Sequence, residues 1–149
     1  MKFILFLILF ILVASCSQKE RNTDVKNLFQ QDFINNRFLS NTILGYETDK
    51  SIIKLWEDKR KTITKSVGVS TSFEKNKFAS GNFSFCGNDY FTDVNGHFVL
   101  YEKNKIMISV DSIKYSGENK KLSEYRNKQE INYIISKKND TIILTKTEH

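Results

Sequence analysis

Enzymes that form covalent intermediates need a nucleophile, a base beside it and a group that orients the base. Away from the N-terminus, one pair has the right residue types: Cys86 and, eleven residues later, His97. The two side chains would meet if the chain between them formed a β-hairpin, but no carboxylate or amide is marked as the third member. A cysteine in an apolar strand is more often a small buried residue. We therefore expect Cys86 to be structural.

Other catalytic and metal-binding patterns are missing from the sequence. It contains no Gly-x-Ser-x-Gly, His-Glu-x-x-His or phosphate-loop motif. Cys86, His97 and His149 lack the paired spacing that zinc ligands show. We therefore predict a protein that is not an enzyme and that holds no metal or cofactor.

One segment matches part of a calcium-binding loop. Asp93, Asn95 and Gly96 fall on positions three, five and six of an EF-hand loop, and Glu102 falls on position twelve. Position one is Phe91, where the loop needs a carboxylate. Asn and Gly both tolerate positive φ, so a tight turn is the simpler interpretation of this segment.

The positive charge of the chain is carried almost entirely by lysine. There are 23 Lys and Arg residues against 17 Asp and Glu, a formal net charge of +6. The lysines are scattered among acidic residues, and the arginines are Arg21, Arg37, Arg60 and Arg126. Nucleic-acid-binding proteins favour the arginine fork for phosphates and guanines. We therefore expect a solvated lysine surface and no nucleic-acid partner.

Aromatic residues are concentrated in one third of the chain. They are Phe73, Phe78, Phe83, Phe85, Tyr90, Phe91, Phe98 and Tyr101. In a β-barrel, such residues either fill the core or line a ligand cavity. A filled core is the more frequent arrangement in small barrels, and the sequence leaves the choice open.

The N-terminus has the pattern of a signal peptide. Lys2 precedes an unbroken run of 12 apolar residues over 3–14. A membrane-spanning helix needs roughly 20 apolar residues, whereas a short run after a positive charge is typical of an export signal. Residues 1–15 are therefore expected to be removed.

Val13-Ala14-Ser15-Cys16 places small residues directly before a cysteine. This segment resembles the lipobox of bacterial lipoproteins. The resemblance implies cleavage after Ser15, a diacylglyceryl group on the Cys16 thiol and acylation of the new amino group. Two or three acyl chains anchor a protein stably. The implied location is the cell envelope, lipid-anchored to the outer membrane because Ser17 is not an inner-membrane retention Asp. The alternative is an ordinary secretory signal with a chance cysteine.

The remaining chain divides into a short tether and one domain. Residues 16–22 are polar and adjacent to the expected anchor. A single β-rich domain is expected over 23–149. Val25, Leu28, Phe29 and Phe33 follow at helical spacing, which predicts an amphipathic helix over about 24–36 that covers the core.

Apolar residues recur at every second position in four later stretches, the period of a strand with one buried face. These residues are Val67, Val69, Thr71 and Phe73; Ala79, Gly81, Phe83 and Phe85; Ile106, Ile108 and Val110; and Ile131, Tyr133 and Ile135. Residues 102–105 and 137–140 are predicted to form hairpin turns. Short strands with close turns favour a mainly β fold: an antiparallel meander or small β-barrel with one N-terminal helix.

Two stretches are ambiguous. Residues 52–56 fit a helical turn or a strand, and we favour a strand with 62–64 as its hairpin partner. Residues 118–130 are polar and fit a short surface helix or a long loop.

The domain resembles lipocalin-like and META-type bacterial envelope domains. The resemblance rests on Gly81-Asn82-Phe83-Ser84-Phe85-Cys86-Gly87-Asn88 and on the late segments 133–135 and 141–144. The META-type Gly-Cys-Asn core is reordered here as Cys86-Gly87-Asn88, and the later Thr-x-Met-Ala-Cys segment is missing. The resemblance implies the β architecture and transfers no functional residue.

The expected function is that of an envelope-anchored, non-enzymatic lipoprotein. Its partners would be the membrane, through Cys16, and either a protein or a small apolar ligand. The alternative is an inhibitor or immunity protein that blocks a hydrolase or toxin. The two differ in what should co-purify with the protein, a small ligand or a stoichiometric protein partner.

Overall fold

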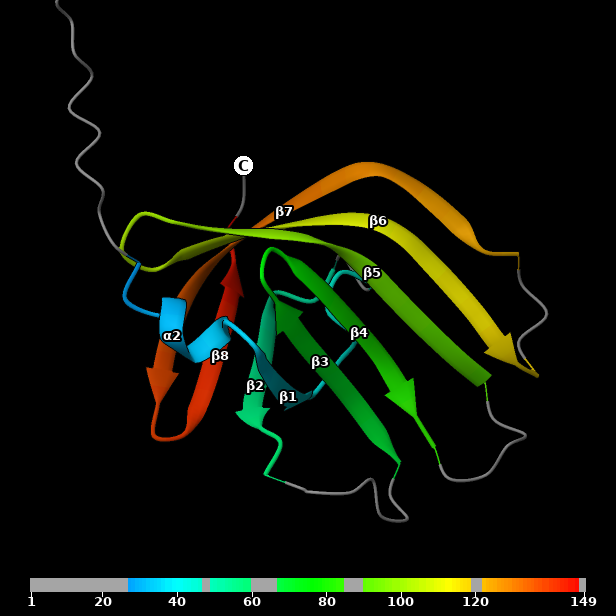
Figure 1. The fold of residues 1–149 in the computed structure, drawn as a ribbon, viewed down its shortest axis with the longest axis horizontal. Helices are drawn as coiled ribbons and strands as arrows, with labels where there is room; N and C mark the ends of the chain where they lie inside the picture. Colours follow the sequence, from blue (N-terminus) through cyan, green and yellow to red (C-terminus); the bar gives the residue numbers. More distant parts are fainter. Residues whose placement is uncertain (1–26, 47–48, 60–66, 85–89, 119–121, 148–149) are drawn as a thin grey trace, which may run out of the picture.

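The computed structural model describes residues 27–46, 49–59, 67–84, 90–118 and 122–147. In this part of the chain, eight antiparallel strands form a closed barrel with one short helix beside it (Figure 1). The prediction of a mainly β fold is confirmed, and the fold is a barrel. The elements are α2 (Gln30–Phe33), β1 (Asn36–Ser40), β2 (Ile52–Glu57), β3 (Gly68–Glu74), β4 (Lys77–Phe83), β5 (Tyr90–Tyr101), β6 (Lys105–Gly117), β7 (Glu124–Lys138) and β8 (Thr141–Lys146).

The strand order around the barrel is β1-β2-β8-β7-β6-β5-β4-β3. Each strand from β3 to β8 lies next to its neighbours in sequence, so this part is a meander. The β1–β2 hairpin closes the barrel with β1 against β3 and β2 against β8. The order places β4 on the opposite side of the barrel from β8.

The predicted alternation of buried and outward residues is confirmed in the later strands. Ile106, Ile108 and Val110 of β6 are fully buried, and on β7 Tyr133 is 1% exposed. Burial raises the pKa of the Tyr133 hydroxyl to about 12, because the charged phenolate is poorly solvated inside the barrel. The inward faces of the strands therefore form one apolar core.

The helix is shorter than the sequence predicts. The structure shows α2 over Gln30–Phe33 in place of a helix over about 24–36, of which 24–26 lie outside the described residues. Asn35 has a φ of 58°, which ends the helix and directs the chain into β1. Phe33 is buried as expected, but Leu28 is 72% exposed and does not cover the core.

A side chain before the helix explains this difference. The Asn27 amide donates hydrogen bonds to the carbonyl oxygens of Tyr101 (3.2 Å) and Lys105 (3.0 Å), at the β5–β6 turn. Its oxygen accepts a bond from the Phe29 N–H at 2.9 Å. Leu28 N–H donates to the Lys103 carbonyl at 2.8 Å. These bonds attach the backbone to the hairpin turn and so compete with helix formation.

The segment Asp93–Gly96 is neither a tight turn nor a calcium loop, because it lies in the middle of β5. The register with β6 shifts between Asn95 and Gly96, and Asp111 is the extra residue opposite. This is a β-bulge. Glycine is required at 96 because a Cβ there would overlap the Ser109 carbonyl oxygen. Close approach of the strands, rather than positive φ, accounts for this glycine.

The two ambiguous stretches both contain strand residues. Residues 52–56 belong to β2, as we favoured, although its partners are β1 and β8. The expected partner 62–64 lies outside the described residues. The stretch 118–130 was predicted as a helix or loop, but β7 begins within it at Glu124. The turns at 102–105 and 137–140 are confirmed as the β5–β6 and β7–β8 hairpins.

Aromatic side chains fill the barrel near α2. The rings of Phe33 and Phe73 pack edge-on with their centroids 4.8 Å apart. The rings of Phe73 and Phe98 also pack edge-on, with their centroids 5.1 Å apart. Phe38 and Phe78 complete this cluster. The aromatic cluster of the sequence therefore contributes core residues through Phe73, Phe78 and Phe98.

The loop between β1 and β2 fills the other part of the interior. Leu44 is fully buried, and its N–H donates to Ser80 Oγ at 2.9 Å. Ser80 and Thr71 share a hydrogen bond of 2.7 Å, which continues to Ser40 at 3.2 Å. Gly45 lies so deep that a Cβ would approach a Val110 methyl to 2.7 Å. We call residues 41–46 the plug loop, because Leu44 and Gly45 within it occupy the barrel interior.

Candidate functional site

The residues singled out from the sequence are only partly within the described structure. Cys16, Cys86 and His149 lie outside it. His97 is on the outward face of β5, half-buried. Its Nδ1 lies 2.8 Å from a carboxylate oxygen of Asp111, the bulge residue of β6. The sequence did not mark Asp111 as a partner, since only the bulge brings it beside His97.

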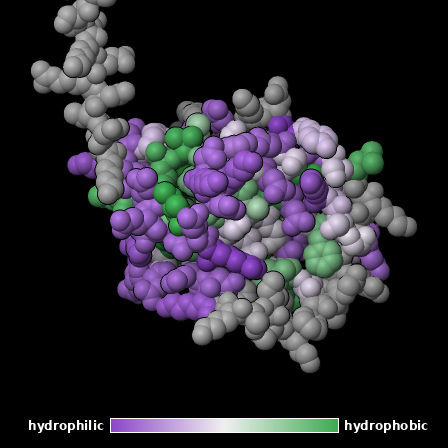
Figure 2. Space-filling model, in the orientation of Figure 1, coloured by the Kyte–Doolittle hydropathy of each residue, from purple (hydrophilic) through white to green (hydrophobic). Residues whose placement is uncertain are grey.

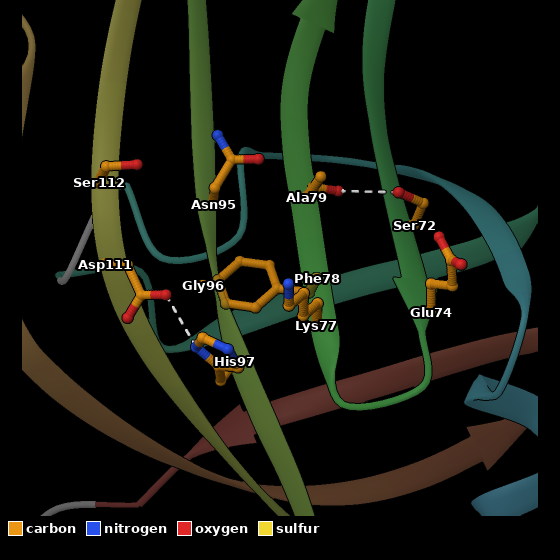
Figure 3. A pocket seen from close by; sticks show the side chains of 10 residues that line it. All are labelled: Ser72, Glu74, Lys77, Phe78, Ala79, Asn95, Gly96, His97, Asp111 and Ser112. Carbon is orange, nitrogen blue, oxygen red and sulfur yellow. Dashed lines mark hydrogen bonds and ion pairs between the residues drawn. The ribbon is translucent and has the colours of Figure 1, made fainter.

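His97 and Asp111 border a depression on the outside of the barrel, which we call the outer trough. It consists of two adjoining hollows on β3–β6, of about 390 and 540 Å³, which share Ser72, Ala79 and Asn95. Figure 3 shows the first hollow with its ten lining side chains. The side of the molecule seen in Figure 2 is mostly hydrophilic.

The depression results from a row of aligned residues. Cross-strand pairing joins Arg37 to Ser72, Ser72 to Ala79, Ala79 to Asn95, and Asn95 to Ser112. Four of these five side chains are short, so the row is low compared with its flanks. Because the row crosses β1, β3, β4, β5 and β6, its alignment depends on the register of five strands of the barrel.

Charged side chains flank this row on one side. Glu74 pairs with Lys77 across β3 and β4, and Lys77 pairs with His97 across β4 and β5. Figure 3 shows Glu74 and Lys77 on the same side of the hollow as the His97–Asp111 pair, with Lys77 next to His97. This flank therefore offers both acceptors and donors.

Asp93 and Lys114 face each other on the other flank. The Asp93 carboxylate lies against Gly81, where a Cβ would overlap its Oδ1. Burial raises the pKa of the Asp93 carboxyl, and the nearby Lys114 ammonium partly opposes this rise. Arg37 at the end of the row forms an ion pair with Asp58 at 3.5 Å.

The trough does not assemble a recognisable catalytic set in the described residues. An Asp–His pair is how many enzymes orient a base. His97, however, forms an ion pair with Asp111 and with no other residue in the described ranges. Cys86, the nucleophile that the sequence suggested, lies outside these ranges. Groups of three or more His, Cys, Asp or Glu side chains that could hold a metal ion are also not found in the described ranges.

Comparisons with protein-family models, with curated proteins and with solved structures find no match to this chain. Among the described residues, no helix is both long enough and apolar enough to cross a membrane.

The sequence contained the trough only as a pattern of small outward residues. Ser70 and Ser72 alternate with buried positions on β3. Ala79 was expected on the buried face of its strand, but the structure exposes Ala79 and buries Ser80, because Phe78 and Ser80 share the inward face of β4. This signal distinguishes strand faces, but it does not show that short side chains on different strands line up.

Proposed function

We propose that the chain is a bacterial lipoprotein, anchored to the cell envelope through Cys16, that acts as a non-enzymatic binding module. The observation that carries the binding role is the outer trough, a hollowed polar surface on β3–β6. The filled interior favours a partner that binds outside the barrel over an apolar ligand held inside it.

The side chains of the trough favour a polar partner of low net charge. Glu74, Asp93 and Asp111 supply acceptors, while Lys77 and Lys114 supply donors. Opposite charges alternate along the flanks, so a strongly charged polymer would meet repulsion as well as attraction. A polar small molecule or a polar protein surface fits this arrangement.

Site-specific photo-cross-linking tests the proposed site. A benzophenone amino acid replaces the exposed Ala79, in the centre of the trough, in the full-length chain inside the cells that produce it. The matched control carries the same group at exposed Asp49, outside the trough. We expect an adduct from position 79 and none from position 49.

Mass spectrometry of the adduct distinguishes a protein partner from a small polar molecule. A stoichiometric hydrolase or toxin in the adduct would favour the inhibitor role expected as the alternative. Equal labelling from both positions, or no adduct from position 79, would contradict a binding role for the trough.

A further inference from the structure

A second surface of the barrel has the opposite character to the outer trough. Ile53 and Leu55 point into the core, so their alternates Ile52 and Trp56 point outward from β2. Ile52 is 48% exposed and Trp56 is 37% exposed. Beside them, β7 presents Ile134, which is 40% exposed. We call this surface the β2–β8–β7 face.

These apolar residues are neighbours through the strand pairing. Ile52 and Ile134 lie on either side of Thr145, which pairs with both. The half-buried Ile143 pairs with Lys54 in the next outward row. Trp56 pairs with Thr141 in the row after that. The face is therefore a continuous surface over three strands.

The charges within the three outward rows of this face are positive, whereas the exposed acidic residues Glu57 and Asp140 lie beyond its Trp56 end. Lys54 lies in its centre, and Lys138 pairs with Thr141 at its edge. The outward residues of β2, β8 and β7 between these rows include no acidic residue. Exposed aliphatic and Trp side chains flanked by lysines are typical of surfaces that meet anionic lipid headgroups.

The described chain also begins beside this face. Asn27 donates a hydrogen bond to the carbonyl of Lys105, and Lys105 pairs with Ile134. Cys16 precedes Asn27 by 27 − 16 = 11 residues. Such a segment spans at most about 40 Å even when fully extended. An anchor at Cys16 would therefore hold the β2–β8–β7 face within reach of the bilayer.

We propose that the β2–β8–β7 face lies on a phospholipid bilayer that carries anionic headgroups. This inference rests on the proposed lipid anchor at Cys16. Since β4 and β8 lie on opposite sides of the barrel, this orientation turns the outer trough away from the membrane. The anchor and the face together then present the binding site to a partner in the aqueous phase.

Trp56 provides a direct probe, because it is the only Trp in the chain. The full chain, processed in bacteria and purified from their membranes, is reconstituted in vesicles of phosphatidylcholine and phosphatidylglycerol in equal amounts. Part of the phosphatidylcholine carries bromine on its acyl chains, which quenches the fluorescence of a Trp side chain that enters the hydrocarbon region of the bilayer. We expect strong quenching of Trp56 and a blue shift of its emission relative to the protein in detergent.

A matched variant moves the Trp to the opposite side of the barrel. Trp56→Phe combined with Ala79→Trp places the single indole in the outer trough, where we expect little quenching. Lys54→Glu with Lys138→Glu should reduce the quenching of Trp56 severalfold, while flotation of the vesicles with the protein is unchanged.

The outcomes separate the two proposals. Protein that floats with the vesicles but shows no quenching of Trp56 contradicts the docked face and leaves the anchor intact. Equal quenching of the Trp at positions 56 and 79 contradicts a fixed orientation of the barrel on the bilayer. Protein that does not float contradicts the anchor and, with it, the docking.

Discussion

Asp93 illustrates how single side chains set the chemistry of the outer trough. Its carboxylate lies against the backbone of β4 only because position 81 is glycine. The contact removes water from the carboxyl and raises its pKa, although Lys114 across β5 and β6 attracts the charged form.

The raised pKa of Asp93 predicts a pH-dependent stability difference. A folded-state pKa above 3.8 means that ionisation weakens the fold, so this cost appears as pH rises from 3.8 through the folded pKa. Asp93→Asn removes the cost. Denaturant melts over this pH range should show the variant gaining stability relative to the parent as pH rises.

Lys114→Gln supplies the control for this prediction. Without the ammonium, the pKa of Asp93 should rise further, and the pH range of the effect should widen upward. A stability difference between Asp93→Asn and the parent that does not vary with pH would contradict the assigned cause.

The plug loop fills the part of the barrel interior that the aromatic cluster does not occupy. Leu44 is held inside by one hydrogen bond, from its N–H to Ser80 Oγ. Ser80 is in turn bonded to Thr71. Ser80 and Thr71 are both buried, so their hydroxyls lie inside the barrel beside the loop. The Leu44 N–H therefore has a hydrogen-bond acceptor although it is surrounded by apolar side chains.

Ser80→Ala should therefore loosen the plug loop. The substitution leaves the buried Leu44 N–H without its acceptor, which costs about 1–3 kcal/mol of stability. Ser72→Ala is the matched control, because Ser72 is only half-buried and its bond to the Ala79 carbonyl is long, at 3.5 Å. Its cost should be under about 0.5 kcal/mol. Urea melts and hydrogen exchange at Leu44 measure both variants, and equal effects would contradict the role of Ser80.

The whole molecule presents two different surfaces on opposite sides of one barrel. Short polar side chains and paired charges lie over β3–β6, whereas isoleucines, Trp56 and lysines lie over β2, β8 and β7. A β-strand allows this because its outward positions are independent of the buried ones. One apolar core can therefore support both the proposed binding site and the proposed membrane-facing surface.

The proposed anchor makes a prediction at this scale. Cys16→Ala removes the thiol that accepts the diacylglyceryl group, so the protein should leave the membrane fraction or remain as an unprocessed precursor. Fractionation and intact-mass analysis of the parent and the variant test this. A mature parent whose unmodified N-terminus is any residue other than Cys16 would contradict the anchor.

The sequence alone determined what depends on near neighbours in the chain. Period-two alternation identified Ile106, Ile108 and Val110 as core, because a strand face is a local property. Local patterns were misleading where distant contacts compete. The helical spacing before residue 36 predicted a long helix, but hydrogen bonds between Asn27 and the β5–β6 turn shorten it. The segment Asp93–Gly96 was interpreted as a turn, but it is part of a bulged strand pair.

Only the tertiary structure decided which outward residues lie together. Arg37 is aligned with Ser72, and Ile52 with Thr145, by the register of strands that are far apart in sequence. The pairing of His97 with Asp111 needs the β6 bulge, and the filled interior needs a loop that folds into the barrel. Closure of the barrel fixes all these registers together, and no short segment of the chain contains that information.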